Sequence, residues 1–110
     1  MSKTALITGA TSGIGRAIAE RFAANGIQLV ICGRRQERLD EMKMELGQKT
    51  KVHTLNFDVR DKDLVSTSIN SLPNDFSEID ILINNAGNAH GLDFIDEGSV
   101  DDWDNMIDIN

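Results

Sequence analysis

The segment Thr8-Gly9-Ala10-Thr11-Ser12-Gly13-Ile14-Gly15 follows a short apolar run, Ala5 to Thr8, and precedes apolar residues at helical spacing. A glycine-rich turn between a strand and a helix lets the backbone come close to a pyrophosphate. We expect Gly9 to allow the tight turn, Gly13 to admit the phosphates and Gly15 to let helix and strand pack closely. The segment therefore predicts phosphate binding, and the absence of a Gly-Lys-Ser/Thr ending excludes a P-loop.

Other groups in this turn can reach the same ligand. The first N–H groups of the helix, aided by the positive end of its dipole, would face the phosphates, and two hydroxyl side chains could add donors. The candidate phosphate-binding residues are Gly9, Ala10, Thr11, Ser12, Gly13, Ile14 and Gly15.

Four short apolar runs alternate with helical patterns along the chain. Three of the runs are continuous, which is typical of strands buried on both faces of a parallel sheet, whereas the third alternates and is expected at an edge. The order predicts an α/β, Rossmann-type, three-layer fold with strands in the order 3-2-1-4, truncated before a second half. The expected strands are 5–8, 29–32, 52–56 and 81–84, the expected helices follow Gly13 and span 36–46 and 61–72, a surface turn is expected at 73–77, and a last helix is expected to begin at Ser99.

Length and composition limit the possible classes of protein. We expect residues 1–110 to form one domain, and 40% apolar with 26% charged residues is ordinary for a globular protein. A net charge of −7 argues against nucleic acid and anionic membranes as partners. The single cysteine, Cys32, and the lack of a signal sequence favour the cytoplasm. His53 and His90 lack metal-ligand spacing, so no metal site is expected.

A second motif, Asn84-Asn85-Ala86-Gly87, ends the fourth expected strand. Together with the T-G-x-x-x-G-x-G spacing of the glycine turn, it makes the whole chain resemble the short-chain dehydrogenase/reductase family. The resemblance implies a dinucleotide cofactor. It also implies that Asn85, Ala86 and Gly87 support the sheet and line the ribose and nicotinamide side of that cofactor.

The end of the second expected strand indicates which dinucleotide is bound. A Rossmann site for NAD needs an acid about 20 residues past the glycines, but none lies between Gln28 and Gln36. Arg34 and Arg35 stand there instead, and arginine makes charge-assisted contacts to a 2′-phosphate. The sequence therefore predicts NADP. Two solvated arginines are the alternative, and a methyltransferase would need an acid at this place.

Asp58 and Val59 follow the third expected strand. The resemblance places them where the family contacts the adenine of the cofactor. From the residues alone, Asp58 could equally cap the helix expected after it. The two roles could also coexist.

Catalysis in this family uses Asn, Ser, Tyr and Lys, and Asn110 matches the first of them by resemblance. The chain contains no tyrosine, so the Y-x-x-x-K motif is absent from it. We therefore expect residues 1–110 alone to be inactive. A homo-oligomer, either a dimer or a tetramer, is expected of the full-length protein.

The segments 33–39, 85–91 and 100–110 resemble NADP-dependent 3-hydroxy acid dehydrogenases of bacteria. This similarity implies a small hydroxy or oxo substrate such as serine, allo-threonine or 3-hydroxypropionate. Two alternatives stay open: a 3-oxoacyl-type reductase and a non-catalytic dinucleotide-binding module.

Overall fold

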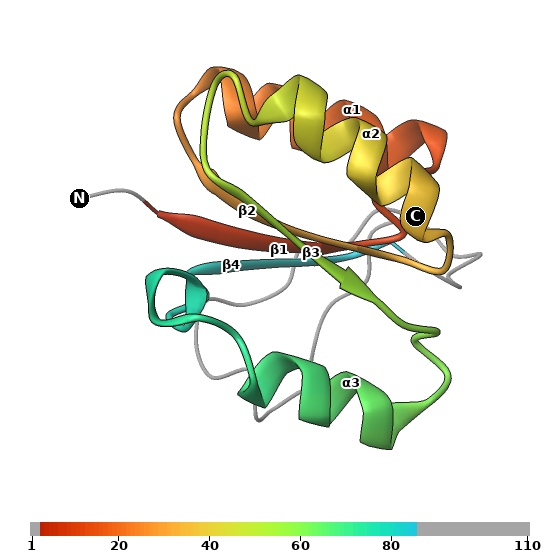
Figure 1. Cartoon of the computed structure of the whole chain (residues 1–110). Coiled ribbons are helices and arrows are strands. Elements are labelled where there is room, and N and C mark those ends of the chain that lie inside the picture. Colours follow the sequence, from red (N-terminus) through yellow and green to blue (C-terminus); the bar gives the residue numbers. More distant parts are fainter. Residues whose placement is uncertain (1–2, 86–110) are drawn as a thin grey trace.

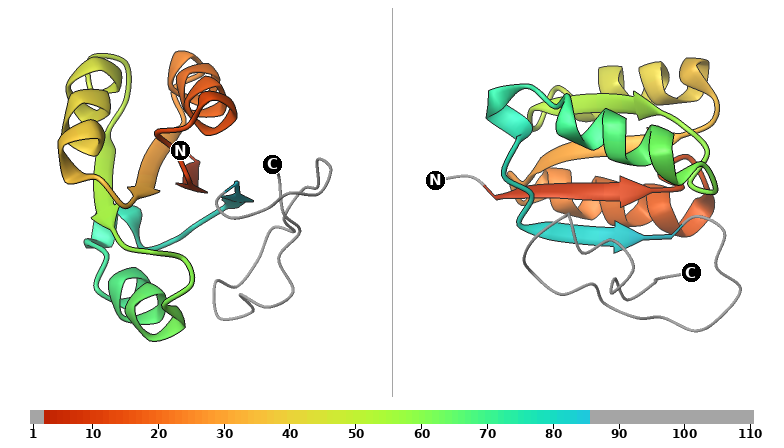
Figure 2. Two further views of the ribbon diagram at one scale, coloured as in Figure 1. Left: turned by 90° about the vertical axis from the view of Figure 1, so that its right-hand side faces the viewer. Right: turned by 90° about the horizontal axis from the view of Figure 1, so that it is seen from below.

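The computed structural model describes residues 3–85 (Figure 1). Within this part, four parallel strands lie in the order β3-β2-β1-β4, which confirms the predicted topology. Helices α1 and α2 cover one face of the sheet and α3 covers the other, so the fold has three layers (Figures 1 and 2). The elements are β1 (Thr4–Thr8), α1 (Gly13–Ala24), β2 (Gln28–Gly33), α2 (Gln36–Leu46), β3 (Val52–Asn56), α3 (Lys62–Asn70), the 3-10 helix η1 (Asn74–Phe76) and β4 (Ile81–Asn84).

The two sides of the sheet form separate apolar clusters, because successive strand residues point to opposite faces. Ile7 and Ile31 join the cluster under α1 and α2, whereas Leu6, Val30 and Cys32 join the one above α3. All five side chains are fully buried. Burial on both faces explains why the first two strands are continuous apolar runs, and β3 lies at the sheet edge as its alternating pattern predicted.

Helix α3 differs from the sequence prediction in its N-cap residue and in its length. Its N-cap is Asp61, whose carboxylate accepts a hydrogen bond of 3.1 Å from the backbone N–H of Leu64. The alternative in which Asp58 caps this helix is therefore wrong. The helix ends at Asn70 rather than at residue 72, because Ser71 turns its hydroxyl to the Ser68 carbonyl at 2.9 Å and a proline follows two residues later.

The segment 73–77 is more than the surface turn that the sequence predicted. It contains η1, and Phe76 is buried against the cluster on the α3 side of the sheet. The Phe76 ring lies 5.4 Å from the ring of His53 on β3, centroid to centroid. The buried Phe76 ring therefore stabilises this end of the sheet. The turn residues around it did not indicate that it would be buried.

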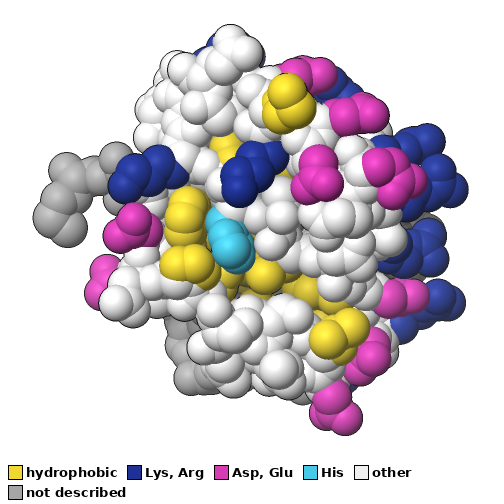
Figure 3. All heavy atoms as spheres, viewed as in Figure 1, with side chains coloured by type: hydrophobic (Ala, Val, Ile, Leu, Met, Phe, Trp, Pro, Cys, Tyr) yellow, Lys and Arg dark blue, Asp and Glu magenta, His cyan; other side chains and the backbone are white. Residues whose placement is uncertain are grey.

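No helix in residues 3–85 is long and apolar enough to cross a membrane. The helix expected from Ser99 lies outside the described residues. Lysine and arginine side chains gather at the edge toward which the strands point, on the right in Figure 3.

Candidate functional site

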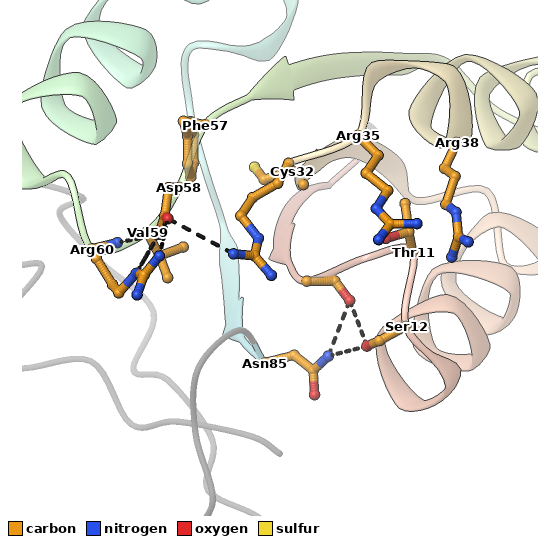
Figure 4. A pocket seen from close by; sticks show the side chains of 13 residues that line it. Thr11, Ser12, Cys32, Arg35, Arg38, Phe57, Asp58, Val59, Arg60 and Asn85 are labelled. Carbon is orange, nitrogen blue, oxygen red and sulfur yellow. Dashed lines mark hydrogen bonds and ion pairs between the residues drawn. The ribbon is translucent and has the colours of Figure 1, made fainter.

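A cleft of about 890 Å³ opens at the carboxyl ends of the strands. In an open parallel sheet, ligands bind where the strand order reverses, and here that place is between β1 and β4. Figure 4 shows the side chains that line the cleft, which come from the glycine turn, the ends of β2 and β4, and the segment after β3. They are Gly9, Thr11, Ser12, Cys32, Gly33, Arg34, Arg35, Arg38, Phe57, Asp58, Val59, Arg60 and Asn85.

Three glycines of the turn have different surroundings. Gly9 has a φ of 59°, a conformation that other residues rarely adopt. A Cβ atom on Gly15 would lie 2.3 Å from the Gly9 carbonyl oxygen, so the helix and the turn can meet only at a glycine. A Cβ atom on Gly13 would meet nothing within 4 Å, so the space beside that backbone is open. The turn and packing roles expected of Gly9 and Gly15 are confirmed.

The rest of the turn is tied to the sheet. The buried Ala10 donates its backbone N–H to the Cys32 carbonyl at 3.1 Å, and the Ser12 hydroxyl donates to the Gly9 carbonyl at 2.8 Å. The Ser12 proton thus points into the turn rather than into the cleft. Thr11 lines the cleft directly, and Ile14 is exposed at the start of α1.

The glycine turn and the motif at the end of β4 contact each other, through Gly9 and Asn85, which are 76 residues apart. The Asn85 side-chain amide donates to the Gly9 carbonyl at 3.1 Å and to the Ser12 hydroxyl at 2.8 Å (Figure 4). One residue earlier, the Asn84 side chain accepts a hydrogen bond of 2.7 Å from the Thr8 hydroxyl. The end of β4 therefore holds the glycine turn in place. Ala86, Gly87 and Asn110 lie outside the described residues.

Arg34 and Arg35, the candidate residues for a 2′-phosphate, both line the cleft. The Arg34 guanidinium lies 3.9 Å from the Asp58 carboxylate and is 71% exposed, so this ion pair is weak. Arg35 is the N-cap of α2, and its carbonyl accepts the backbone N–H groups of Arg38 and Leu39. The arginine pair therefore sits at the junction of β2 and α2, on the border of the cleft.

Asp58 is held by Arg60 rather than by a helix. Its carboxylate accepts bonds of 2.7 to 3.2 Å from the Arg60 guanidinium and one of 2.9 Å from the Arg60 backbone N–H. The side-chain hydrogen bonds from Arg60 come first among the causes that lower the Asp58 pKa, from 3.8 to about 2. Val59 packs partly against the apolar cluster beneath it. Asp58 is therefore a fixed anion beside the cleft.

Cys32 lies fully buried at the end of β2. Burial raises the pKa of its thiol far above the ordinary value, so the reactive thiolate does not form at neutral pH. The sequence interpretation of Cys32 as buried strand filling is confirmed. Among residues 3–85, no group of three or more His, Cys, Asp or Glu side chains could hold a metal ion.

The cleft also contains residues that the sequence did not single out. The candidates Ala10, Gly13, Ile14 and Gly15 lie outside its lining, whereas Arg38 and Arg60 belong to it. Both arginines had a signal: Arg38 stands one helical turn beyond Arg35, and Arg60 stands two residues beyond Asp58. The further lining residues that the sequence missed are Cys32, Gly33 and Phe57.

Comparison with known proteins adds an independent finding. A family model described as short chain dehydrogenase matches residues 3–110. Sulfoacetaldehyde reductase 2 of Chromohalobacter salexigens is 48% identical over all 110 residues, which are 44% of that protein. An NADP-dependent 3-hydroxy acid dehydrogenase of Salmonella typhi is 47% identical over 96% of this chain and 42% of its own length.

Among solved structures, the closed form of a serine dehydrogenase complexed with NADP+ has 42% identity and a TM-score of 0.68. The match covers 94% of this chain and 41% of that one. The chain thus spans less than half the length of the relatives that it matches.

Proposed function

Because the chain belongs to the short chain dehydrogenase family, we propose that it is the NADP(H)-binding part of an oxidoreductase. The reaction would transfer a hydride between NADP(H) and the carbon of an alcohol or carbonyl group, with the bound cofactor supplying or accepting that hydride. One observation carries the proposal. A single cleft joins the glycine turn to an arginine-bearing strand end that has no acid where NAD needs one.

The shape and charge of the cleft fit a dinucleotide phosphate. Next to the cleft-lining Ser12, the open space beside Gly13 leaves room for a pyrophosphate at the first turn of α1. Four arginines and one aspartate line the cleft, so its side chains carry a net positive charge. A ligand with several phosphates suits this excess, because arginine pairs with phosphate oxygens through parallel N–H groups.

Each group of residues would contact a different part of the cofactor. The turn from Gly9 to Gly15 would hold the pyrophosphate, and Arg34 with Arg35 would hold the 2′-phosphate. Asp58 and Val59 would border the adenine. On the other side, Asn85 with Ala86 and Gly87 would border the ribose next to the nicotinamide.

The chemical step needs a proton donor or acceptor beside the hydride carrier. Asn110 is our candidate for the asparagine of the family's catalytic set. Because the chain has no tyrosine, we expect residues 1–110 to bind the cofactor as one domain without turning over. A cytoplasmic location and a homo-oligomeric full-length protein stay predictions.

We propose a small 3-hydroxy acid as the substrate, such as serine, allo-threonine or 3-hydroxypropionate. Two relatives support this choice by name, the 3-hydroxy acid dehydrogenase of Salmonella typhi and the serine dehydrogenase bound to NADP+. The sulfoacetaldehyde reductase is similar to this chain over all 110 residues. A small substrate with an acidic group is common to all three names.

A fluorescence titration of the folded protein with NADPH and NADH at one fixed, low salt concentration tests the cofactor. We expect NADPH to bind at least about tenfold more tightly, or about 1.4 kcal/mol. Equal or tighter binding of NADH would contradict the NADP assignment. For the reaction, NADP+ reduction by the longest chain that the gene encodes should require serine or 3-hydroxypropionate, and an inactive but NADPH-binding full chain would favour the non-catalytic module instead.

A further inference from the structure

The charged side chains of the cleft fall into two groups. Asp58 pairs with Arg60 at 2.7 Å and with Arg34 at 3.9 Å, so the single acid is shared by two arginines. Arg35 and Arg38 make no ion pair with any carboxylate in residues 3–85. Two of the three uncompensated positive charges on the cleft side chains therefore lie at the start of α2.

These two arginines share one side of the cleft. Figure 4 shows both side chains extending from the beginning of α2 toward Thr11 in the glycine turn, away from Asp58. Arg35 is the N-cap of α2 and Arg38 its third residue, so both side chains leave the backbone within the first turn of the helix. Thr11 lines the cleft as well. The geometry thus presents two guanidinium groups and one hydroxyl to the same space.

The electrostatic setting is unfavourable without an anion. Arg35 is the N-cap of α2 and Arg38 is its third residue, so both cations face the positive end of the helix dipole. They also repel each other across one helical turn. Glu41 lies one turn beyond Arg38, yet the two form no ion pair. A bound dianion would relieve both repulsions at once.

The backbone that carries the pair is firmly placed. Leu39, the next residue along α2, is fully buried in the core, and its side chain packs against Gly33, where a Cβ would come within 3.4 Å. The start of α2 is therefore pressed against the end of β2. The Cα positions of Arg35 and Arg38 are therefore fixed relative to the cleft.

We propose that Arg38 is a specificity-determining residue that completes, with Arg35, a clamp for the 2′-phosphate of NADP(H). The proposal rests on the proposed function, since it places one phosphate of that cofactor. Arg34 borders the same phosphate from the side of Asp58. Arg38 discriminates between the two dinucleotides because only NADP(H) carries the group that it contacts.

The test compares Arg38→Gln with Arg21→Gln in the longest chain that the gene encodes. Both changes remove one positive charge, and Arg21 lies in the last turn of α1, outside the cleft lining. Glutamine retains a long side chain and a good helix propensity, so folding should be maintained in both variants. Binding of NADPH, NADH and 2′,5′-ADP is measured for each at one salt concentration.

We expect Arg38→Gln to weaken NADPH and 2′,5′-ADP by about tenfold and to change NADH by less than about twofold. Arg21→Gln should leave all three dissociation constants within about twofold of the unaltered protein. Equal losses of NADPH and NADH in Arg38→Gln, or no loss of NADPH, would overturn the role of Arg38. A lack of NADPH preference in the unaltered protein would instead overturn the proposed function, and the clamp with it.

Discussion

The glycine turn and the arginine segment 34–38 border the same cleft but present their binding groups in different ways. The turn offers backbone, held by a positive φ at Gly9 and by two hydrogen bonds from Asn85. The arginine segment offers three long, exposed guanidinium side chains, and within residues 3–85 only that of Arg34 forms an ion pair, at 3.9 Å. The first is shaped before any ligand arrives, whereas the second can adjust to one.

This difference separates affinity from selectivity. In the proposed binding mode the glycine turn would contact the part that NADPH and NADH share, so damage to it should weaken both cofactors equally. In the same proposed binding mode the exposed arginines would contact the part that distinguishes the two cofactors, so damage there should change the ratio of the two affinities. Variants in the two regions therefore test whether affinity and selectivity depend on different residues.

Gly15→Ala should have the largest effect. The new methyl group would lie 2.3 Å from the Gly9 carbonyl oxygen and 2.8 Å from the Asn85 amide nitrogen, so backbone must move. We expect a loss of about 1–3 kcal/mol in the free energy of unfolding and loss of measurable binding of both cofactors. Thermal melting and titration measure the two effects.

Gly13→Ala is the matched control for Gly15→Ala. Its methyl group meets no atom within 4 Å, and alanine favours a helix more than glycine does, so stability should be unchanged or slightly higher. Binding of both cofactors should still weaken, because the methyl group occupies the open space proposed for the pyrophosphate. A Gly13→Ala variant that binds normally would move the pyrophosphate away from this residue.

Arg34→Ala combined with Arg35→Ala should have the next largest effect, on NADPH alone. We expect at least about tenfold weaker NADPH binding, or about 1.4 kcal/mol, with NADH nearly unchanged. The combination of Arg21→Ala with Lys49→Ala removes the same charge from exposed positions outside the cleft and controls for the general field. Equal losses for both cofactors would remove the 2′-phosphate argument.

Asn85→Ala should have a smaller effect on both cofactors. It deletes two hydrogen bonds that hold the glycine turn, at 3.1 and 2.8 Å, so binding should weaken by about fivefold. Because the turn is shared, the ratio of NADPH to NADH affinity should not change, and 2′,5′-ADP should weaken as well although it lacks the nicotinamide half. Asn25→Ala, which loses one side-chain hydrogen bond far from the cleft, is the control. Normal 2′,5′-ADP binding would mean that Asn85 acts on the nicotinamide side only.

Local patterns predicted the elements well, because each depends on neighbouring residues. The continuous and alternating apolar runs gave the strands and their order, and the pattern of α2 gave its bounds, Gln36–Leu46. The glycine turn was predictable for the same reason: its chemistry lies within eight consecutive residues. Asp61, in contrast, competes with Asp58 for the same cap, and only the backbone path decides between them.

What the sequence missed depends on contacts between distant segments. The bonds from Asn85 to the turn span 73 and 76 residues, and no periodicity encodes them. Phe76 became a core residue because β3 and η1 meet, although its neighbours read as a turn. Arg38 carried a signal, its spacing from Arg35, but only the cleft distinguishes it from a solvated helix cation.

Protonation of Asp58 at low pH should have the smallest effect, and this effect is on the stability of the fold. Its pKa in the folded protein is about 2, below the ordinary 3.8, so the pairing with Arg60 stabilises the fold fully above about pH 4 and is lost as the pH falls through about 2. Because this pKa lies far below pH 5, NADPH binding should show no step from Asp58 between pH 5 and 8. The carboxyl carbon shift of Asp58, followed by NMR from about pH 6 to 2, measures the pKa directly. A midpoint near 4 would mean that Arg60 does not hold Asp58. The pairing that keeps this acid away from Arg35 and Arg38 would then be absent.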